Sequence, residues 1–336
     1  MPRIEDYLDA LREGEARTLH LREGAPPFWR VGTELLQHGD PLPDGDQFQA
    51  MVLDLFRAAR LEPPIDLASA DFTLCAAGGR FRAHVYRSCD GLNAVLHRIP
   101  DRVPALERLD VPEAIASSLA APSGLLLICG PARSGKSSIL ASLVDLFNRT
   151  ESRMIATVEN PIEHLHAPVK AIVHQIGVGT DVPDCAVGIA AARAARADII
   201  AVDGARDASS FREMIAAAEE GALVLGVLCA TSALDALERI LESAPAEEVA
   251  WFRSGLAASL LAVLHQALHP ARGGGVVAAV EHLTMTRPAQ LLLREGKMEE
   301  LAAMVQGGRS HEGSLHAPAH AAHEHPRPRP HPEARR

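Results

Sequence analysis

One loop constrains the fold of this chain more than any other feature. Residues Gly130 to Ser137 read GPARSGKS and meet the spacing GxxxxGK[ST]. The apolar run Leu125–Cys129 comes directly before the loop, and Ser138–Phe147 has a helical pattern directly after it. A buried strand, a glycine-rich turn and a helix in this order are typical of a P-loop. The sequence therefore predicts an α/β fold built around this loop.

The loop has the chemistry of a phosphate site. Its glycines allow backbone conformations that turn successive N–H groups toward an anion, and the N-terminus of the following helix adds positive potential. Lys136 can reach the β- and γ-phosphates, and the Ser137 hydroxyl can ligate Mg²⁺. We therefore expect ATP or a close relative to bind here with Mg²⁺. The expected phosphate-binding residues are Gly130, Pro131, Ala132, Arg133, Ser134, Gly135, Lys136, Ser137 and Ser138.

The pattern of apolar residues divides the chain into four parts. Residues 1–99 mix short alternating runs with helical ones and predict a small α+β domain, and the prolines within 100–112 predict a linker. In 113–306 buried runs alternate with alanine-rich helical segments, as in a mostly parallel α/β sheet. Residues 307–336 hold six histidines and a PRPRPHP run. This composition predicts a disordered tail with only weak, adventitious metal binding.

The expected elements follow from these patterns. In the first part we expect helices at Ile4–Arg12 and Phe48–Arg60, a short apolar run at Thr18–Leu21, and strands at Phe28–Val31, Phe81–Tyr86 and Leu92–His97. In the third part we expect strands at Leu125–Cys129, Met154–Val158, Ala171–Gln175, Ile199–Val202 and Leu223–Leu228, with helices at Val187–Arg196 and Ser209–Glu220.

Composition argues against several classes of function. A formal net charge of −10 argues against a protein that binds nucleic acid along its phosphate backbone. No stretch approaches about 20 apolar residues, and the charged N-terminus lacks the apolar core of a signal peptide. The five cysteines are scattered without CxxC spacing, which favours reduced thiols over zinc ligands or disulfides. We therefore expect a cytoplasmic protein.

Further segments, in one order with the loop, carry a family resemblance. They are GRFRAHVYRSCDGLNAVLHRIP at 79–100, TVENPIEHLH at 157–166, DIIAVDGARD at 198–207, LGVLCATSALDALERI at 225–240 and PAQLLLREGKMEEL at 288–301. Over about residues 1–306 the chain resembles the type IV pilus retraction ATPase family, the PilT-like members of the secretion ATPase superfamily. The combination is far more specific than any one of these motifs.

The resemblance implies a fold, an assembly and a set of partners. It implies an N-terminal PAS-like α+β domain followed by a RecA-like P-loop ATPase domain, assembled as a homo-hexamer or as a mixed hexamer with a related ATPase. It also implies an inner-membrane platform protein of the type IV pilus as partner, and hence a peripheral location at that membrane. By resemblance, Arg80, Arg82 and Arg87 contact phosphates across an interface; the alternative is that they are exposed strand arginines.

Two acidic positions near the reacting phosphate match the family only in part. Glu163 matches the family's general base, or else it is an exposed turn carboxylate. Gly204 stands where the family's Walker B segment has a glutamate, and Asp203 lies one position earlier. Asp203 is therefore the candidate to hold Mg²⁺ with Ser137 and to serve in catalysis. The exchange is not simple, because successive strand residues point to opposite faces.

Other positions have lost polar groups that the family carries. Ala222 and Cys229 stand at histidine positions, and Asn160 stands at an aspartate position. Arg133 is unusual in such a loop, and it either adds charge to the phosphate site or projects into solvent. Losing one electrostatic partner at a reacting centre typically costs about 10²–10³ in rate. Several losses together predict slow hydrolysis or none.

Three functions fit these observations. The leading hypothesis is a PilT-like ATP-binding motor protein of the type IV pilus system, active in pilus retraction and twitching motility, with weakened hydrolysis. The alternative is an ATP-binding pseudo-ATPase paralogue that regulates an active pilus motor. A third is a nucleotide-dependent scaffold unrelated to pili, since P-loop folds host many functions.

Overall fold

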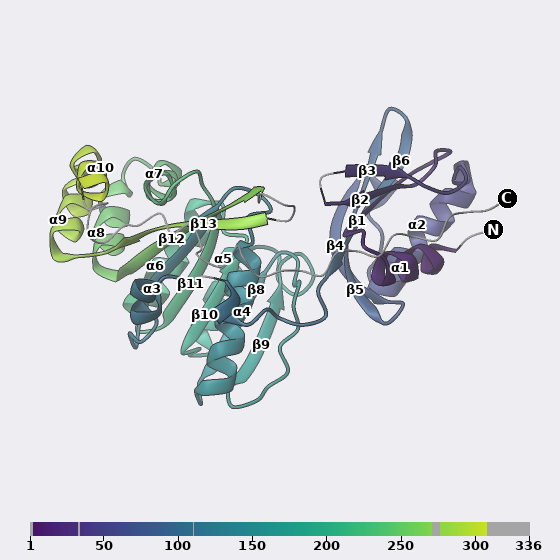
Figure 1. Ribbon diagram of the computed structural model, residues 1–336. Helices are drawn as coiled ribbons and strands as arrows, with labels where there is room; N and C mark the ends of the chain where they lie inside the picture. Colours follow the sequence, from purple (N-terminus) through teal and green to yellow (C-terminus); the bar gives the residue numbers. More distant parts are fainter. Residues whose placement is uncertain (1–2, 33, 110, 271–275, 308–336) are drawn as a thin grey trace.

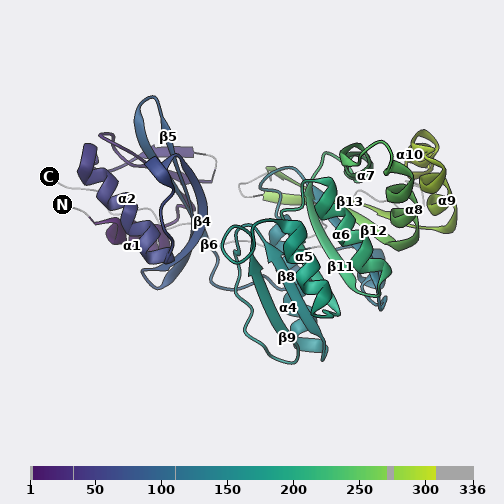
Figure 2. The same cartoon turned by 180° about the vertical axis from the view of Figure 1, so that it is seen from behind.

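The computed structural model describes residues 3–32, 34–109, 111–270 and 276–307. Within these ranges the chain forms two sheets, one of six strands and one of seven, each with its own helices (Figures 1 and 2). The predicted histidine-rich tail, 307–336, lies outside the described residues except for Gly307, where the last helix ends. The bodies lie side by side and are joined by the segment that follows the first sheet (Figure 1).

The first sheet is antiparallel throughout and has the order β3-β2-β1-β6-β5-β4 in the described residues. Its elements are α1 (Ile4–Glu13), β1 (Thr18–Arg22), β2 (Phe28–Val31), β3 (Glu34–Gln37), α2 (Gly45–Ala59), η1 (Ile65–Leu67), β4 (Ser69–Ala76), β5 (Gly79–Ser88) and β6 (Gly91–Ile99). The predicted β5–β6 hairpin is confirmed, with Ser88 opposite Gly91.

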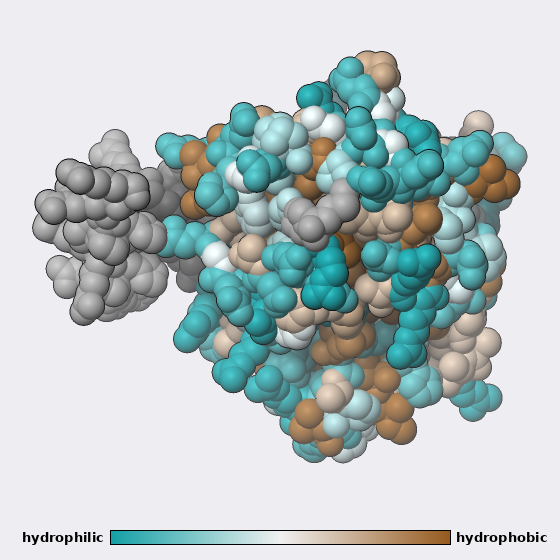
Figure 3. Space-filling model, turned by 90° about the vertical axis from the view of Figure 1, so that its right-hand side faces the viewer, coloured by the Kyte–Doolittle hydropathy of each residue, from teal (hydrophilic) through white to brown (hydrophobic). Residues whose placement is uncertain are grey.

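The alternation of side chains along β5 explains how this sheet is covered. Phe81, Ala83 and Val85 are buried and pack with residues of α1 and α2, whereas Arg80 and Arg82 lie on the opposite face. The two helices cover the face turned away from the second sheet (Figure 1). On the outer side of this domain, apolar residues are interspersed with hydrophilic ones (Figure 3). The polar face of the sheet is therefore the one turned toward the rest of the molecule.

The second sheet has the order β13-β12-β7-β11-β10-β8-β9 within the described ranges, and only β12 and β13 pair antiparallel. After η2 (Leu106–Arg108), its elements are α3 (Glu113–Ser118), β7 (Gly124–Gly130), α4 (Lys136–Thr150), β8 (Met154–Glu159), β9 (Ile172–Gly177), α5 (Cys185–Ala194), β10 (Ile199–Asp203), α6 (Ala208–Glu219), β11 (Leu223–Cys229), α7 (Ala233–Ser243), α8 (Val249–Ser259), β12 (Leu260–Pro270), β13 (Val276–Thr284), α9 (Arg287–Glu295) and α10 (Met298–Gly307).

Strand β7 is buried along its whole length, which is the pattern of a central parallel strand. Leu126 and Ile128 pack on the face covered by α3 and α4, and Leu125 and Leu127 pack on the face covered by α5 to α8 (Figures 1 and 2). The segment before α3 runs along α4, where Ser142 Oγ donates to the carbonyl oxygen of Pro104 at 2.7 Å. The loop after β7 is thereby anchored to a strand with both faces covered.

The five strands predicted between residues 113 and 306 are confirmed, with ends shifted by a residue or two. The long hairpin of β12 and β13 was not predicted from the sequence. Residues 288–301, one of the segments that carry the family resemblance, fall on two helices, because Gly296 adopts φ 75° and ends α9.

Removal of a core side chain from α8 tests how much the second sheet depends on its helices. Leu256 is fully buried, so Leu256→Ala is expected to lower the free energy of unfolding by about 2–5 kcal/mol. Leu291→Ala, at a half-exposed position of α9, should change it by about 0.5 kcal/mol or less. Trp251 fluorescence in urea, in a Trp29→Phe background, reports this transition. Equal midpoints for the two variants would contradict the assignment of α8 to the core.

Candidate functional site

The loop between β7 and α4 has the backbone of a phosphate cradle. Gly130 has φ 153° and Gly135 has φ 92°, conformations that residues with side chains rarely adopt. A Cβ atom on Gly130 would lie 2.1 Å from a carbonyl oxygen of β12, so this position has no room for a side chain. Arg133 also has a left-handed φ of 63°, and its side chain is exposed.

The N-terminus of α4 is free to receive an anion. Its cap, Gly135, offers no side-chain hydrogen bond, and the first turn holds no acidic residue. Its N–H groups therefore keep their positive potential for a ligand. Lys136 is buried, and its Nζ donates to the carbonyl oxygen of Pro131 at 2.7 Å, so the ammonium lies folded over the loop. The residues present thus fit the phosphates of a nucleotide.

Ser137 and Asp203 come together across the edge of the sheet. The Ser137 hydroxyl donates to Asp203 Oδ2 at 2.7 Å, which joins α4 to the carboxyl end of β10. Burial raises the pKa of Asp203, and the hydrogen bond from Ser137 partly opposes that shift. A hydroxyl and a carboxylate are oxygen donors of the kind Mg²⁺ prefers. Among the described residues, no group of three or more His, Cys, Asp or Glu side chains could hold a metal by itself.

Glu159 is a site residue that the sequence reading did not select. Strands β8 and β10 are parallel and in register, so Glu159 lies directly opposite Asp203. Its Oε1 accepts from Thr157 Oγ1 at 2.6 Å and from Gln175 Nε2 at 3.3 Å. Burial raises the pKa of Glu159 to about 7, and the nearby carboxylates of Asp203 and Glu163 add to the shift. Both TVE and AVD end a buried strand with an acid, and that shared pattern was the available signal.

Gly204 has a backbone that argues against a side chain. Its φ is 127°, in the region that favours glycine. Asp203 therefore supplies the carboxylate at the end of β10, one residue before the position at which the family pattern has its glutamate. At the end of β11, Cys229 lies opposite Gly130 and is exposed, while Ala222 directly before that strand is buried. The position beside the loop thus carries a thiol.

Of the three arginines predicted to contact phosphates, Arg80 and Arg82 contact Glu163, and Arg87 does not. Arg82 pairs with Glu163 Oε1 at 2.8 Å and with both carboxylate oxygens of Asp71 at 2.9 and 2.6 Å. Arg80 donates to the carbonyl oxygens of Ile162 at 2.7 Å and Glu163 at 2.6 Å. These contacts connect β5 of the first sheet to the segment after β8.

Arg87 lies elsewhere, near the far end of β5. It is exposed, and its Nε donates to the carbonyl oxygen of Asp66 at 2.6 Å. Within one chain Arg87 stabilises the turn before β4 and makes no hydrogen bond to the phosphate loop among the described residues.

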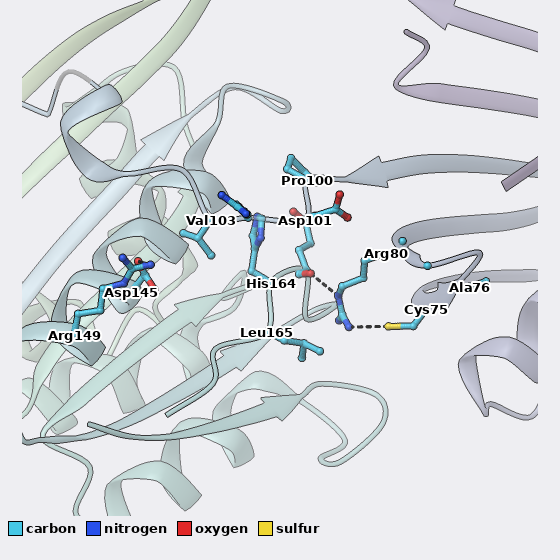
Figure 4. Close-up of a pocket in the computed structure, with 14 residues that line it drawn as sticks. Cys75, Ala76, Arg80, Pro100, Asp101, Val103, Asp145, Arg149, His164 and Leu165 are labelled. Carbon is cyan, nitrogen blue, oxygen red and sulfur yellow. Dashed lines mark hydrogen bonds and ion pairs between the residues drawn. The ribbon is translucent and has the colours of Figure 1, made fainter. Parts of the chain in front are cut away.

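A cleft of about 850 Å³ lies between the two bodies (Figure 4). Arg80 and Cys75 from the first sheet face His164 and Leu165 of the second body across it, and Asp145 of α4 lines its far side. Residues 130–138 do not line this cleft, so it is separate from the phosphate loop.

The fold and the loop together define a P-loop protein, in which an antiparallel sheet precedes the mostly parallel sheet that carries the loop. A family model described as type II/IV secretion system protein matches residues 107–287, and the chain belongs to this family, within the secretion ATPase superfamily. It is a divergent PilT-like member. No helix among the described residues is long and apolar enough to cross a membrane.

Individual relatives support this assignment over most of the chain. The chain is 35% identical to the type IV pilus retraction ATPase PilT of Pseudomonas aeruginosa, over 88% of this chain and 86% of that protein. It is 29% identical to the type IV pilus ATPase PilU of the same organism, over 90% of this chain and 80% of that protein. A crystal structure of the pilus retraction motor PilT with bound ADP superposes with a TM-score of 0.80 at 30% identity, covering 91% of this chain and 90% of that chain.

The raised pKa of Glu159 predicts a pH dependence of stability. The folded state holds the proton up to about pH 7, whereas the unfolded carboxyl releases it near 4.5, so this residue lowers stability as pH rises between those values. Glu159→Gln removes the titration, so its stability relative to wild type should rise from pH 5 to pH 8. Urea midpoints at both pH values measure the effect, with Glu247→Gln on the surface as the matched control. A constant difference between wild type and Glu159→Gln would contradict it.

Proposed function

We propose that this protein is an ATP-binding motor protein of the type IV pilus system, acting in pilus retraction and twitching motility. The observation that carries the proposal is the uncapped N-terminus of α4 behind a glycine-shaped loop, with Lys136 folded over it. The similarity to PilT and PilU supports the pilus assignment. A PilT structure with bound ADP supports the choice of nucleotide.

The domain division supports the same proposal. In this proposal, residues 1–99 form a PAS-like domain, residues 100–112 form a linker, and residues 113–306 form a RecA-like nucleotide-binding domain. The face of the first sheet that carries Arg80 and Arg82 is turned toward the second body. In a homo-hexamer, or a mixed hexamer with a related ATPase, this polar face is the surface available to phosphates at an interface. The pilus platform protein at the inner membrane is the proposed partner.

Residues 130–138 bind the phosphates in this proposal, and Ser137 and Asp203 hold Mg²⁺. The metal ion supplies positive charge that offsets the charge developing on the phosphates. Lys136 adds a second positive charge, and the N–H groups of α4 orient the phosphate oxygens. These contributions depend on the backbone and on three side chains, those of Lys136, Ser137 and Asp203.

Hydrolysis is weakened in this proposal because the groups that would position and activate the attacking water are either missing or already paired with another side chain. Glu163, the candidate base, is paired with Arg82, and the end of β10 presents Asp203 followed by a glycine with φ 127°. Cys229 offers a thiol at the loop in place of an imidazole. The alternative, a pseudo-ATPase that regulates an active pilus motor, differs only in having no turnover.

Binding and turnover measured together test the proposal. We expect submillimolar binding of ATP with Mg²⁺, and turnover at least a hundredfold below the ~10 s⁻¹ typical of enzymes. Lys136→Ala should abolish binding, because it removes the ammonium beside the phosphates. Glu163→Gln should keep binding and lower any phosphate release further. Calorimetry and a phosphate-release assay measure these quantities.

Lys170→Ala is the matched control, because Lys170 is exposed and its Nζ donates to the carbonyl oxygen of Thr150 at the far end of α4. It should bind as wild type does. Failure of the wild type to bind ATP would overturn the proposal itself. Binding without any phosphate release would favour the pseudo-ATPase.

The position of the carboxylate after β10 yields a separate prediction. Gly204→Glu alone should not speed hydrolysis, since a side chain at φ 127° costs about 1–3 kcal/mol of strain. The double change Asp203→Gly with Gly204→Glu restores the family order, and the glycine at 203 gives the backbone the freedom to move position 204 out of φ 127°. We expect at least a tenfold faster phosphate release from the double variant than from wild type. A gain from Gly204→Glu alone, equal to that of the double variant, would show that the backbone is no obstacle.

A further inference from the structure

Gln266 is a buried polar residue next to the phosphate loop, and it is not among the site residues described above. It lies on β12, which runs parallel to β7, and the last pair between these strands is His265 with Cys129. Gln266 therefore comes level with Gly130, where the loop begins. Gln266 is only 3% exposed.

Gln266 contacts the loop at three points. Its Nε2 donates to the carbonyl oxygen of Ser134 at 2.6 Å. A Cβ atom on Gly130 would lie 2.1 Å from the Gln266 carbonyl oxygen, and one on Gly135 would lie 2.6 Å from Gln266 Nε2. The glycines at both ends of the loop thus make room for this one residue, whose backbone contacts the start of the loop and whose amide contacts its end.

The hydrogen bond to Ser134 fixes the direction of the next peptide N–H. In a planar trans peptide the C=O and the following N–H point in opposite directions. With the Ser134 carbonyl held toward β12, the N–H of Gly135 points away from β12. That N–H belongs to the last residue before α4, where the loop and the helix N-terminus converge on an anion.

The arrangement costs stability. Gln266 Oε1 and Ser134 Oγ are buried and have no hydrogen-bond partner among the described residues. Buried polar atoms without partners are unfavourable, and an apolar side chain of similar size would avoid the orphaned amide oxygen. Packing alone therefore does not account for an amide at this position, whereas its contact with the loop does.

We propose that Gln266 is a positioning residue of the phosphate loop, which holds the Ser134–Gly135 peptide in the orientation that binds the terminal phosphates of a nucleoside diphosphate or triphosphate. This inference rests on the proposed binding of nucleotide at the loop. Gln266 acts through Ser134 and Gly135 and contacts no ligand itself. The loop of a P-loop protein binds the α- and β-phosphates and its lysine reaches the β- and γ-phosphates. The effect of Gln266 is therefore larger for ADP than for AMP, which has no β-phosphate.

Gln266→Met tests the inference, because methionine keeps the volume and removes the amide. Leu264→Met is the matched control, since Leu264 is buried on the same strand two residues earlier. Binding of ADP and of AMP to the full chain is measured by calorimetry. We expect Gln266→Met to weaken ADP about tenfold and to leave the affinity for AMP within about twofold, so the ratio of the two affinities falls. Leu264→Met should keep the wild-type ratio.

Gln266→Glu gives a second readout if the methionine variant does not fold. A carboxylate has the same size but places an acceptor against the Ser134 carbonyl, so it should lower the ADP-to-AMP ratio at least as far. Thermal unfolding shows that each variant is folded, and a purely structural role would shift the unfolding temperature without changing that ratio. If wild type binds ADP and a folded variant keeps the wild-type ratio, the inference is wrong. If wild type does not bind ADP, the proposed function has failed instead.

Discussion

The burial of β7 between two parallel neighbours is the constraint on which the rest of the structure depends. All seven residues of the strand are buried; β11 flanks it in register on one side, and β12 flanks it on the other with one irregularity between Leu260 and Ala262. Parallel strands end at a common edge, so the loop after β7, Asp203 at the end of β10 and Glu159 at the end of β8 meet there. The site is therefore a consequence of strand register, and the contact between Ser137 and Asp203 links that edge to α4.

The two bodies are connected through the same edge. Arg80 and Arg82 leave the polar face of the first sheet and bind the segment that carries Glu163. Because Arg82 also binds Asp71, its charge is shared between two carboxylates. A movement of one sheet relative to the other would change what Glu163 is paired with. The ion pair of Glu163 is thus tied to the arrangement of the two bodies.

The sequence predicted much of this arrangement because the strongest signals were local. The loop, β7 and α4 follow from one motif and its flanks, and the five predicted strands of the second sheet follow from short apolar runs between helices. The β12–β13 hairpin was missed because LLAVLHQALHP continues the apolar pattern of α8 without a turn residue between them. Glu159 was missed because its place beside Asp203 depends on register between strands about forty residues apart. Arg87 lies five residues after Arg82 on β5, so its side chain starts from the opposite face of the strand and farther along it from Glu163.

Binding and hydrolysis make different demands on a sequence, which is why a divergent member of this family can keep one and weaken the other. Phosphate binding rests mainly on backbone N–H groups, and those are set by Gly130, Gly135 and the start of α4. Hydrolysis rests on side chains at single positions, and no backbone geometry replaces a missing carboxylate or imidazole. Strands β10 and β11 keep their parallel register up to Asp203 and Cys229, so the residues at 204 and 229 leave the cradle beside them undisturbed. The loop and the side chains at the strand ends therefore answer to separate physical constraints, although they share one edge of one sheet.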